Sequence, residues 1–247
     1  MKKVTRREFL EVATGGGAAV ALGSAGMVEA AAANAQSSPA AGARKLIIPT
    51  DNPDRFHAKV MEFNPVRAVD ESAWQLEVGG MVAQPLRLSL AEVRKLPMLR
   101  QNSRMKCVQC WSTRITWEGF RTAELLKLAK PLPGATPIRL DCADRYYDFN
   151  TLAEMLHPHT LFALKMNGEA LSPEHGAPLR LVMPAKYGYK SSKLNTKITL
   201  LNHGGQGVVA DTWPYYTQGG DIQPGYDHPF DLPGQTRKIA GGEITDY

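Results

Sequence analysis

Alternating apolar and polar residues recur along most of the chain and predict a series of short β-strands. Residues 74–78 alternate and end at a glycine pair, and residues 86–88 supply the returning strand. A period of two fits a strand because successive side chains point to opposite faces of a sheet. Further strands are predicted at residues 46–48, 137–142, 146–149, 160–165, 179–183 and 197–201.

Short helices interrupt these strands. Ser89 is placed to cap a helix over residues 90–95, because Glu92 follows three positions later as in a capping box. Two more helices are predicted, at residues 122–129, which Pro131 closes, and at residues 151–156. Short strands mixed with short helices, without internal repeats, indicate an α+β domain.

Residues 1–35 are predicted to be an export signal and not part of the fold. Two lysines precede the twin-arginine sequence Thr5-Arg6-Arg7-Glu8-Phe9-Leu10, a weakly apolar Ala/Gly/Val run follows, and residues 33–35 form a small-x-small cleavage site. This pattern predicts periplasmic export of a protein that has already folded, commonly around a cofactor. Residues 36–54 are small and polar at their start and form a flexible leader.

Composition and charge exclude several classes of function. Four of the 29 basic and three of the 24 acidic residues lie in residues 1–35, so 25 basic and 21 acidic residues remain. That net charge of +4 is too small and too scattered to indicate nucleic-acid binding. Beyond the signal, no stretch reaches the roughly 18 apolar residues of a transmembrane helix. The sequence has three cysteines and no second CxxC, and it lacks the motifs of covalent haem, a phosphate loop and a dinucleotide fold.

The segment from residue 104 to residue 120 carries the candidate chemistry. Cys107 and Cys110 lie between flanks that are predicted as short extended segments, with Trp111 and Trp117 close by. Three interpretations remain open from this segment alone. Cys107 is a small buried apolar residue, or half of a CxxC redox or zinc pair, or a single thiolate ligand for a soft transition metal.

Taken singly, the other polar residues do not indicate a functional site. Arg180 alone fits a surface residue, His175 fits a turn, and the basic and aromatic segment 186–193 fits a solvated loop. The two tryptophans fit the core of the domain. These residues gain meaning only from their order along the chain.

Taken in order, the segments resemble the sulfite oxidase family of molybdopterin-dependent oxidoreductases, and within it the periplasmic catalytic subunits of methionine sulfoxide reductases. The resemblance covers about residues 55–201 and implies one molybdopterin-binding α+β domain, with residues 202–247 as a C-terminal extension packed on it. The motifs that carry it are Met61-Glu62-Phe63, Arg104-Met105-Lys106-Cys107-Val108 with Trp111-Ser112 and Trp117, His157-Pro158, His175-Gly176-Ala177-Pro178-Leu179-Arg180, and Tyr187-Gly188-Tyr189-Lys190 through Lys193.

The resemblance also implies a set of site residues. Cys107 matches the catalytic thiolate ligand of molybdenum, and a thiolate is a donor suited to this soft, redox-active metal. Arg180 and Lys193 match basic residues that hold the pterin phosphate. Ser191 and Ser192 match positions whose backbone amides cradle that phosphate. The remaining positions that match cofactor contacts are Met61, Glu62, Cys142 and His175.

The chain departs from the family's pattern at three places. Cys110 replaces a small residue, so a CxxC overlies the expected metal site. The substrate-binding arginine of the sulfite oxidases, which aligns near Met61, is missing. Residues 202–247 replace the longer C-terminal region of the reductases. Cationic residues that could serve an anionic substrate are His57, Lys59, Arg145 and Lys186.

The implied function is that of a periplasmic molybdenum–molybdopterin oxidoreductase that transfers an oxygen atom at a sulfur or nitrogen centre. Reduction of an S-oxide such as protein methionine sulfoxide is expected ahead of sulfite oxidation. Electrons are expected to pass through a cytochrome or a membrane haem protein, because the chain carries no haem or iron–sulfur motif. The residues after Leu201 are too few to encode the sulfite oxidases' dimerisation domain, so a monomer is expected. Two alternatives are a CxxC thiol–disulfide protein and a binding module that has kept the fold without catalysis.

Overall fold

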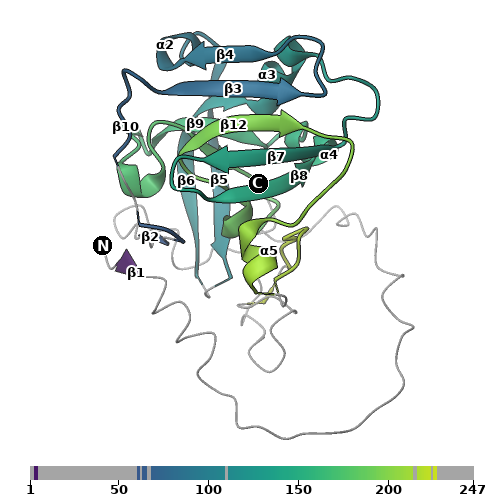
Figure 1. The fold of residues 1–247 in the computed structure, drawn as a ribbon. Coiled ribbons are helices and arrows are strands. Elements are labelled where there is room, and N and C mark those ends of the chain that lie inside the picture. The colour runs from purple at the N-terminus through teal and green to yellow at the C-terminus, as the bar shows by residue number, and fades with distance from the viewer. Residues whose placement is uncertain are drawn as a thin grey trace, which may run out of the picture.

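Two five-stranded sheets make up the body of the protein (Figure 1). The computed structural model describes residues 3–4, 60–61, 63–65, 68–108, 111–213, 216–223 and 225–226 of the 247-residue chain. The first sheet has the strand order β4-β3-β12-β7-β8, in which β3 and β12 are parallel and the other pairs antiparallel. Its strands are β3 (Gln75–Gly80), β4 (Leu86–Ser89), β7 (Pro137–Cys142), β8 (Tyr147–Thr151) and β12 (Asn195–Leu200).

The second sheet is built on one long hairpin. Its strands β5 (Met98–Cys107) and β6 (Trp111–Arg121) pair from Met98 with Phe120 to Cys107 with Trp111. The prediction of extended segments around the cysteines is confirmed, but the strands are 10 and 11 residues long and not short. The sheet continues through β9 (Leu161–Met166), which pairs with β6, β10 (Glu169–Ala170) and β11 (Arg180–Val182).

The helices are short, and two of them begin with a capping box, the predicted one at Ser89 and a second at Thr151. Ser89 caps α2 (Leu90–Val93) with Glu92 closing the box, and Thr151 caps α4 (Leu152–Met155) with Glu154 in the same role. The predicted helix at residues 122–129 is confirmed as α3 (Thr122–Ala129). The other helical elements are α5 (Val208–Thr212) and the 3₁₀ turns η3 (Pro173–His175) and η4 (Gly188–Lys190). Within the described residues, no helix is long and apolar enough to cross a membrane.

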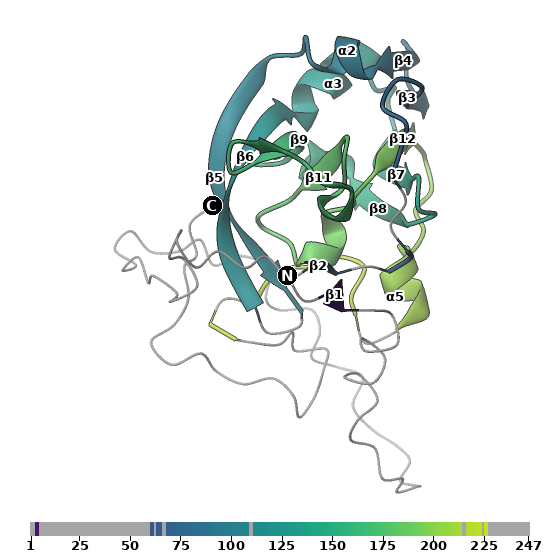
Figure 2. The same cartoon turned by 90° about the vertical axis from the view of Figure 1, so that its left-hand side faces the viewer.

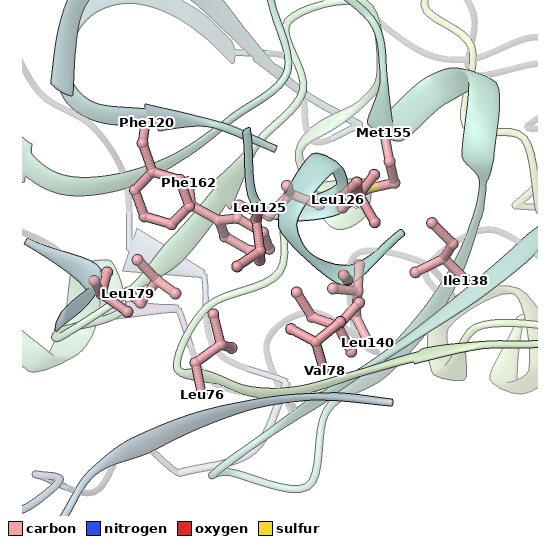
Figure 3. Packing of buried hydrophobic residues seen from close by; sticks show 14 of the residues in the cluster. Leu76, Val78, Phe120, Leu125, Leu126, Ile138, Leu140, Met155, Phe162 and Leu179 are labelled. Atoms are coloured by element: carbon pink, nitrogen blue, oxygen red, sulfur yellow. The ribbon is translucent and has the colours of Figure 1, made fainter. Parts of the chain in front are cut away.

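The main core lies between the two sheets, with α3 inserted at one end (Figure 2). Figure 3 shows Leu125 and Leu126 of this helix between the side chains of the two sheets. Leucine fits this place because α3 presents one apolar face to the core. The labelled core residues of the first sheet are Leu76, Val78, Ile138 and Leu140, and those of the second sheet are Phe120 and Phe162.

Most predicted elements are found within a few residues of their predicted bounds, and the α+β class is confirmed. The predicted helices at 90–95 and 151–156 are one turn long, ending at Val93 and Met155. Two short pairings were not predicted: β10 against β9, and β1 (Lys3–Val4) in parallel with β2 (Val60–Met61). The predicted strand at residues 46–48 lies outside the described residues.

Candidate functional site

Cys107 is the last residue of β5, at the end of the long hairpin. Its side chain is buried, with 7% of its surface exposed. The loop that contains η4 lies directly against it, since Lys106 and Tyr187 form a parallel bridge. A Cβ added to Gly188 would lie 3.4 Å from the carbonyl oxygen of Lys106 and 4.0 Å from Cα of Cys107. The backbone of residues 187–188 and the end of β5 are therefore in close contact.

Cys107 belongs to a buried cluster that is rich in aromatic side chains. The buried cluster that contains it includes Tyr187 from the η4 loop and Trp213 and Tyr216 from the C-terminal segment. Tyr187 stacks on Tyr189 with 6.4 Å between ring centroids, and Tyr189 lies 5.7 Å from the ring of Tyr216. Cys107 is therefore buried in a cluster in which aromatic residues predominate.

A second group of predicted site residues gathers around Arg180, the first residue of β11. The guanidinium of Arg180 donates to the carbonyl oxygen of His175 at 3.1 Å and to that of Ser191 at 3.5 Å. Its Cζ lies 4.9 Å from the ring centroid of Trp117, and its Nη2 lies 3.9 Å from the sulfur of Met105. Met105 and Trp117 belong to the hairpin β5–β6, so Arg180 connects the loops to the hairpin that bears Cys107.

Gly176 allows Lys193 to pack close to Arg180. Its φ of +101° suits glycine, and an added Cβ would lie 2.8 Å from Cβ of Lys193 and 3.1 Å from Cβ of Arg180. Lys193 donates from Nζ to the carbonyl oxygen of Glu174 at 2.8 Å. A larger residue at position 176 would push the two cationic side chains apart.

Asn195 organises the remaining predicted residues, and the sequence did not identify it. Its side-chain oxygen accepts from the hydroxyl of Ser192 at 2.8 Å and from the thiol of Cys142 at 3.8 Å. Its amide nitrogen donates to the carbonyl oxygen of Ser192 at 2.9 Å, and its own carbonyl accepts from the indole of Trp74 at 3.2 Å. Burial raises the pKa of the Cys142 thiol well above its usual value, so that thiol stays protonated at neutral pH. No local pattern in the sequence marks this role, because the hydrogen bonds with Cys142 and Trp74 join residues 53 and 121 positions apart.

The structure therefore brings six predicted residues close together through the hydrogen bonds of Arg180 and Asn195 and the close packing at Gly176: Cys142, His175, Arg180, Ser191, Ser192 and Lys193. Cys107 lies beside this group, next to η4. Met61 is the second residue of β2, and Glu62 and Cys110 lie outside the described residues. A thiol–disulfide protein of the thioredoxin type would place its CxxC at the start of a helix, whereas this chain continues from Trp111 as strand β6.

Comparison with known proteins identifies the family. The model of the oxidoreductase molybdopterin binding domain matches residues 63–209, more than half of the chain. The chain belongs to this family. The matched range includes both Cys107 and the group around Arg180, so the site they form is part of a molybdopterin-binding domain.

This chain matches only part of the length of the proteins to which it is similar. The methionine-sulfoxide reductase catalytic subunits MsrP of Gluconobacter oxydans and Campylobacter jejuni are 35% and 31% identical to it over 178 residues. The matches cover 63% of this chain and 56% and 59% of the two relatives, so the chain spans a little over half their length. The sulfane dehydrogenase SoxCD of Paracoccus pantotrophus is similar in fold, with a TM-score of 0.55 and 19% identity over 70% of this chain and 46% of that one.

Arg180 provides a test of whether the site fits a molybdopterin. Its side chain is buried, and in the described part of the chain no carboxylate forms an ion pair with it. Its Nε has no hydrogen-bond partner there either. Burial lowers the pKa of Arg180 to about 10, which leaves it charged at neutral pH. A buried cation without an anion is costly, and the phosphate of a molybdopterin is an anion of suitable chemistry for this place.

His175 adds a second buried polar atom at the same place. Its Nδ1 lies 2.9 Å from the hydroxyl of Ser172, while its Nε2 is buried and has no hydrogen-bond partner among the described residues. Burial, together with the positive charges of Arg180 and Lys193, lowers the pKa of His175 to about 4. The ring is therefore neutral at pH 7 and can offer a hydrogen bond to a bound group. The residues present fit the molybdopterin that the family binds.

Proposed function

We propose that this protein is a periplasmic molybdenum–molybdopterin oxidoreductase that reduces an S-oxide, with protein-bound methionine sulfoxide as the expected substrate. The observation that carries the proposal is the buried Arg180, which has no carboxylate partner among the described residues and lies beside Ser191 and Lys193 within a molybdopterin-binding domain. The similarity to two methionine-sulfoxide reductase catalytic subunits supports the substrate class. The twin-arginine pattern at residues 5–10 supports export to the periplasm.

Each predicted residue has a part in holding the cofactor. Arg180 and Lys193 would bind the pterin phosphate as a planar fork and a point charge. Ser192 would offer its backbone amide to the same phosphate, with Ser191 beside it, whose own amide donates to the carbonyl oxygen of Gly188 at 3.1 Å. His175 would donate from Nε2. Cys107 would be the thiolate ligand of the metal, because it is the cysteine at the end of β5 that the η4 loop covers. Met61, Glu62 and Cys142 would contact the pterin.

When bound, the molybdenum cofactor supplies two-electron oxygen-atom transfer. Reduction of an S-oxide to a sulfide consumes two electrons and two protons and releases one water molecule. The chain's own part is to exclude water with the aromatic residues around Cys107 and to fix the cofactor's orientation. The electrons would come singly from a redox partner such as a cytochrome or a membrane haem protein.

The charge of Lys186 favours a neutral S-oxide over sulfite. Its Nζ forms ion pairs with Asp221 at 2.7 Å and with Glu154 at 2.5 Å. Burial opposes its charge, but the two carboxylates outweigh this effect and raise the pKa of Lys186 above its usual value. Lys186 is thus charged and neutralised by its neighbours, so it offers little attraction to a dianion. Of the other cationic candidates, Arg145 is exposed on a turn, and His57 and Lys59 lie outside the described residues.

Two measurements test the proposal. Full-length protein from a host that makes the cofactor is expected to hold one molybdenum and one pterin per chain by elemental and pterin analysis. It is expected to oxidise a reduced one-electron dye with methionine sulfoxide much faster than it reduces an oxidised dye with sulfite. Zinc or no metal after full molybdenum supply would contradict the cofactor assignment. Faster sulfite-dependent dye reduction would contradict the direction and favour a sulfite dehydrogenase.

A further inference from the structure

The C-terminal segment from residue 216 to residue 223 pairs with the loop that leads into η4. The amide of Tyr187 donates to the carbonyl oxygen of Gly220 at 2.8 Å, and the amide of Ile222 donates to that of Ala185 at 3.4 Å. Lys186 and Asp221 form an antiparallel bridge between these two hydrogen bonds. The segment therefore lies along the loop as a short extra strand, and its backbone holds that of residues 185–187.

Side chains extend this pairing to η4 itself. The hydroxyl of Tyr189 donates to the carbonyl oxygen of Thr217 at 2.7 Å, and the amide of Gln223 donates to the hydroxyl of Tyr187 at 3.4 Å. Gly220 has a φ of +62°, and a Cβ there would overlap the aliphatic stem of Lys190 and lie 3.2 Å from the hydroxyl of Tyr189. The close approach of the segment to η4 thus needs glycine at position 220.

Gln218 joins the segment to a buried polar group. Lys190 of η4 donates from Nζ to Asp148 at 2.8 Å and to the carbonyl oxygen of Phe149 at 2.7 Å, and both charged side chains are almost fully buried. The side-chain amide of Gln218 donates to the same carbonyl at 2.6 Å and to Asp148 at 3.4 Å. Its oxygen accepts from the amide of Gly207 at 2.6 Å, just before α5, which lies beside β8 in Figure 1.

Gln218 is thereby the one side chain among these that contacts β8, the carboxylate partner of Lys190 and the start of α5 together. Removing it would leave a buried carbonyl, a buried carboxylate and a backbone amide with fewer partners, which is costly in a buried network. The η4 turn ends at Ser191 and continues as Ser192 and Lys193, and Gly188 lies against Cys107. Any loosening of the segment would therefore affect the position of residues 191–193 and the contact between Gly188 and Cys107.

We infer that residues 216–223 form a clamp that holds the loop 185–193 against Cys107, and that Gln218 is a positioning residue for the cofactor site. The effect on the cofactor rests on the proposed function, whereas the clamping of the loop does not. The sequence gives no periodic signal for this role, because the clamp consists of glycine, backbone carbonyls and single polar side chains.

Hydrogen–deuterium exchange on the full chain tests the clamp, with and without bound cofactor. In Gln218→Ala, peptides covering residues 185–193 are expected to exchange about tenfold faster, because the buried hydrogen bonds that oppose opening are lost. Tyr189→Phe removes one hydroxyl and is expected to give a smaller increase of about threefold. Gln206→Ala is the matched control, because Gln206 is an exposed glutamine next to Gly207. This variant is expected to leave the exchange rates of residues 185–193 unchanged. Peptides of β12 are expected to keep their exchange rate in all three variants.

Two further readouts separate positioning from general stability. After reduction, Cys107 in cofactor-free Gln218→Ala is expected to react about tenfold faster with iodoacetamide, while the buried Cys142 keeps its rate. In cofactor-loaded protein, the same variant is expected to lose pterin faster on dialysis than Gln206→Ala.

Three results would overturn the clamp. Unchanged exchange of residues 185–193 while the segment 216–223 itself opens would show that the segment does not hold the loop. Equal acceleration in β12 would show a global loss of stability in place of clamping. If Gln218→Ala does not fold, an unchanged exchange rate of residues 185–193 in Tyr189→Phe would contradict the inference. A wild-type protein that binds no molybdopterin would contradict the proposed function and leave the exchange result standing.

Discussion

Arg180 is the buried cation for which the proposed cofactor would supply an anion. Its guanidinium is held between the carbonyls of His175 and Ser191 and the ring of Trp117, all of which can stabilise a cation without neutralising it. Such a site keeps its charge available for an anion. At the residue scale, the proposed site is therefore a buried guanidinium and a half-buried lysine with a thiol nearby, and the chemistry of each residue can be tested singly.

The two cysteines of the 107–110 pair are expected to differ. Cys107→Ser should abolish turnover, because a hydroxyl is a poor substitute for a thiolate on a soft metal, while Cys110→Ser should keep most of it. Dye-linked sulfoxide reduction and molybdenum content measured on both variants check this. Equal loss in both variants with the metal retained would instead favour a role for the CxxC pair.

His175 predicts a pH dependence of stability. Its pKa is about 4 in the folded protein, below the ordinary histidine value of 6.5, so between these values the unfolded chain binds more protons. Stability is therefore expected to fall as the pH drops from 6.5 to 4, by about 2 kcal/mol after allowance for solvent screening. Urea unfolding of cofactor-free protein at pH 7 and pH 4.5 measures it. His175→Gln should lose that much less than the wild type over the same interval, and an identical loss in both would refute the assignment.

At the scale of elements, the pairing of β6 with β9 depends on a glycine. The register between these strands shifts between Glu118 and Gly119, where the backbones approach closely. A Cβ on Gly119 would overlap the carbonyl oxygen of Phe162 and lie 2.8 Å from Cα of Ala163. The contact is with backbone, which cannot move aside without breaking the strand pairing that leads towards Cys107.

Gly119→Ala is therefore expected to lower the free energy of unfolding by about 3 kcal/mol. Gly79→Ala is the matched control, because Gly79 is a strand glycine with nothing within 4 Å of an added Cβ. Urea unfolding of both variants gives the comparison. Similar stability of the two would show that the backbone at residue 119 can relax.

The elements show which features a sequence can predict. Strands and capped helices were predictable, since alternation and the Ser89 and Thr151 caps are local patterns. The motifs around Cys107 and Arg180 indicated the family. The roles of Asn195 and Gln218 were not predictable, because each depends on hydrogen bonds to residues distant in sequence. Gln218 binds Phe149 across 69 positions.

At the scale of the whole molecule, both sheets contribute residues to the proposed site. The first sheet supplies β8 and β12, which carry Asp148 and Asn195 beneath the η4 loop, and the second supplies β5 with Cys107 and β11 with Arg180. The η4 loop lies where these elements meet, and the segment 216–223 covers it. On the same loop, the charge of Lys186 is balanced by two carboxylates, Glu154 and Asp221.

That balance gives a prediction about anions. Glu154→Gln keeps the capping function at α4, because glutamine also closes a capping box, but it removes one of the two charges that neutralise Lys186. Sulfate and sulfite are then expected to inhibit sulfoxide reduction about fivefold more strongly, because Lys186 would attract these anions by roughly 1 kcal/mol more.

Glu92→Gln is the matched control, as it changes the same position of the other capping box, where the helix N-cap is Ser89. Inhibition constants measured at several salt concentrations should show the difference shrinking as salt rises. Equal inhibition of both variants would mean that Lys186 does not face the bound substrate, and the argument from charge for a neutral S-oxide would fail.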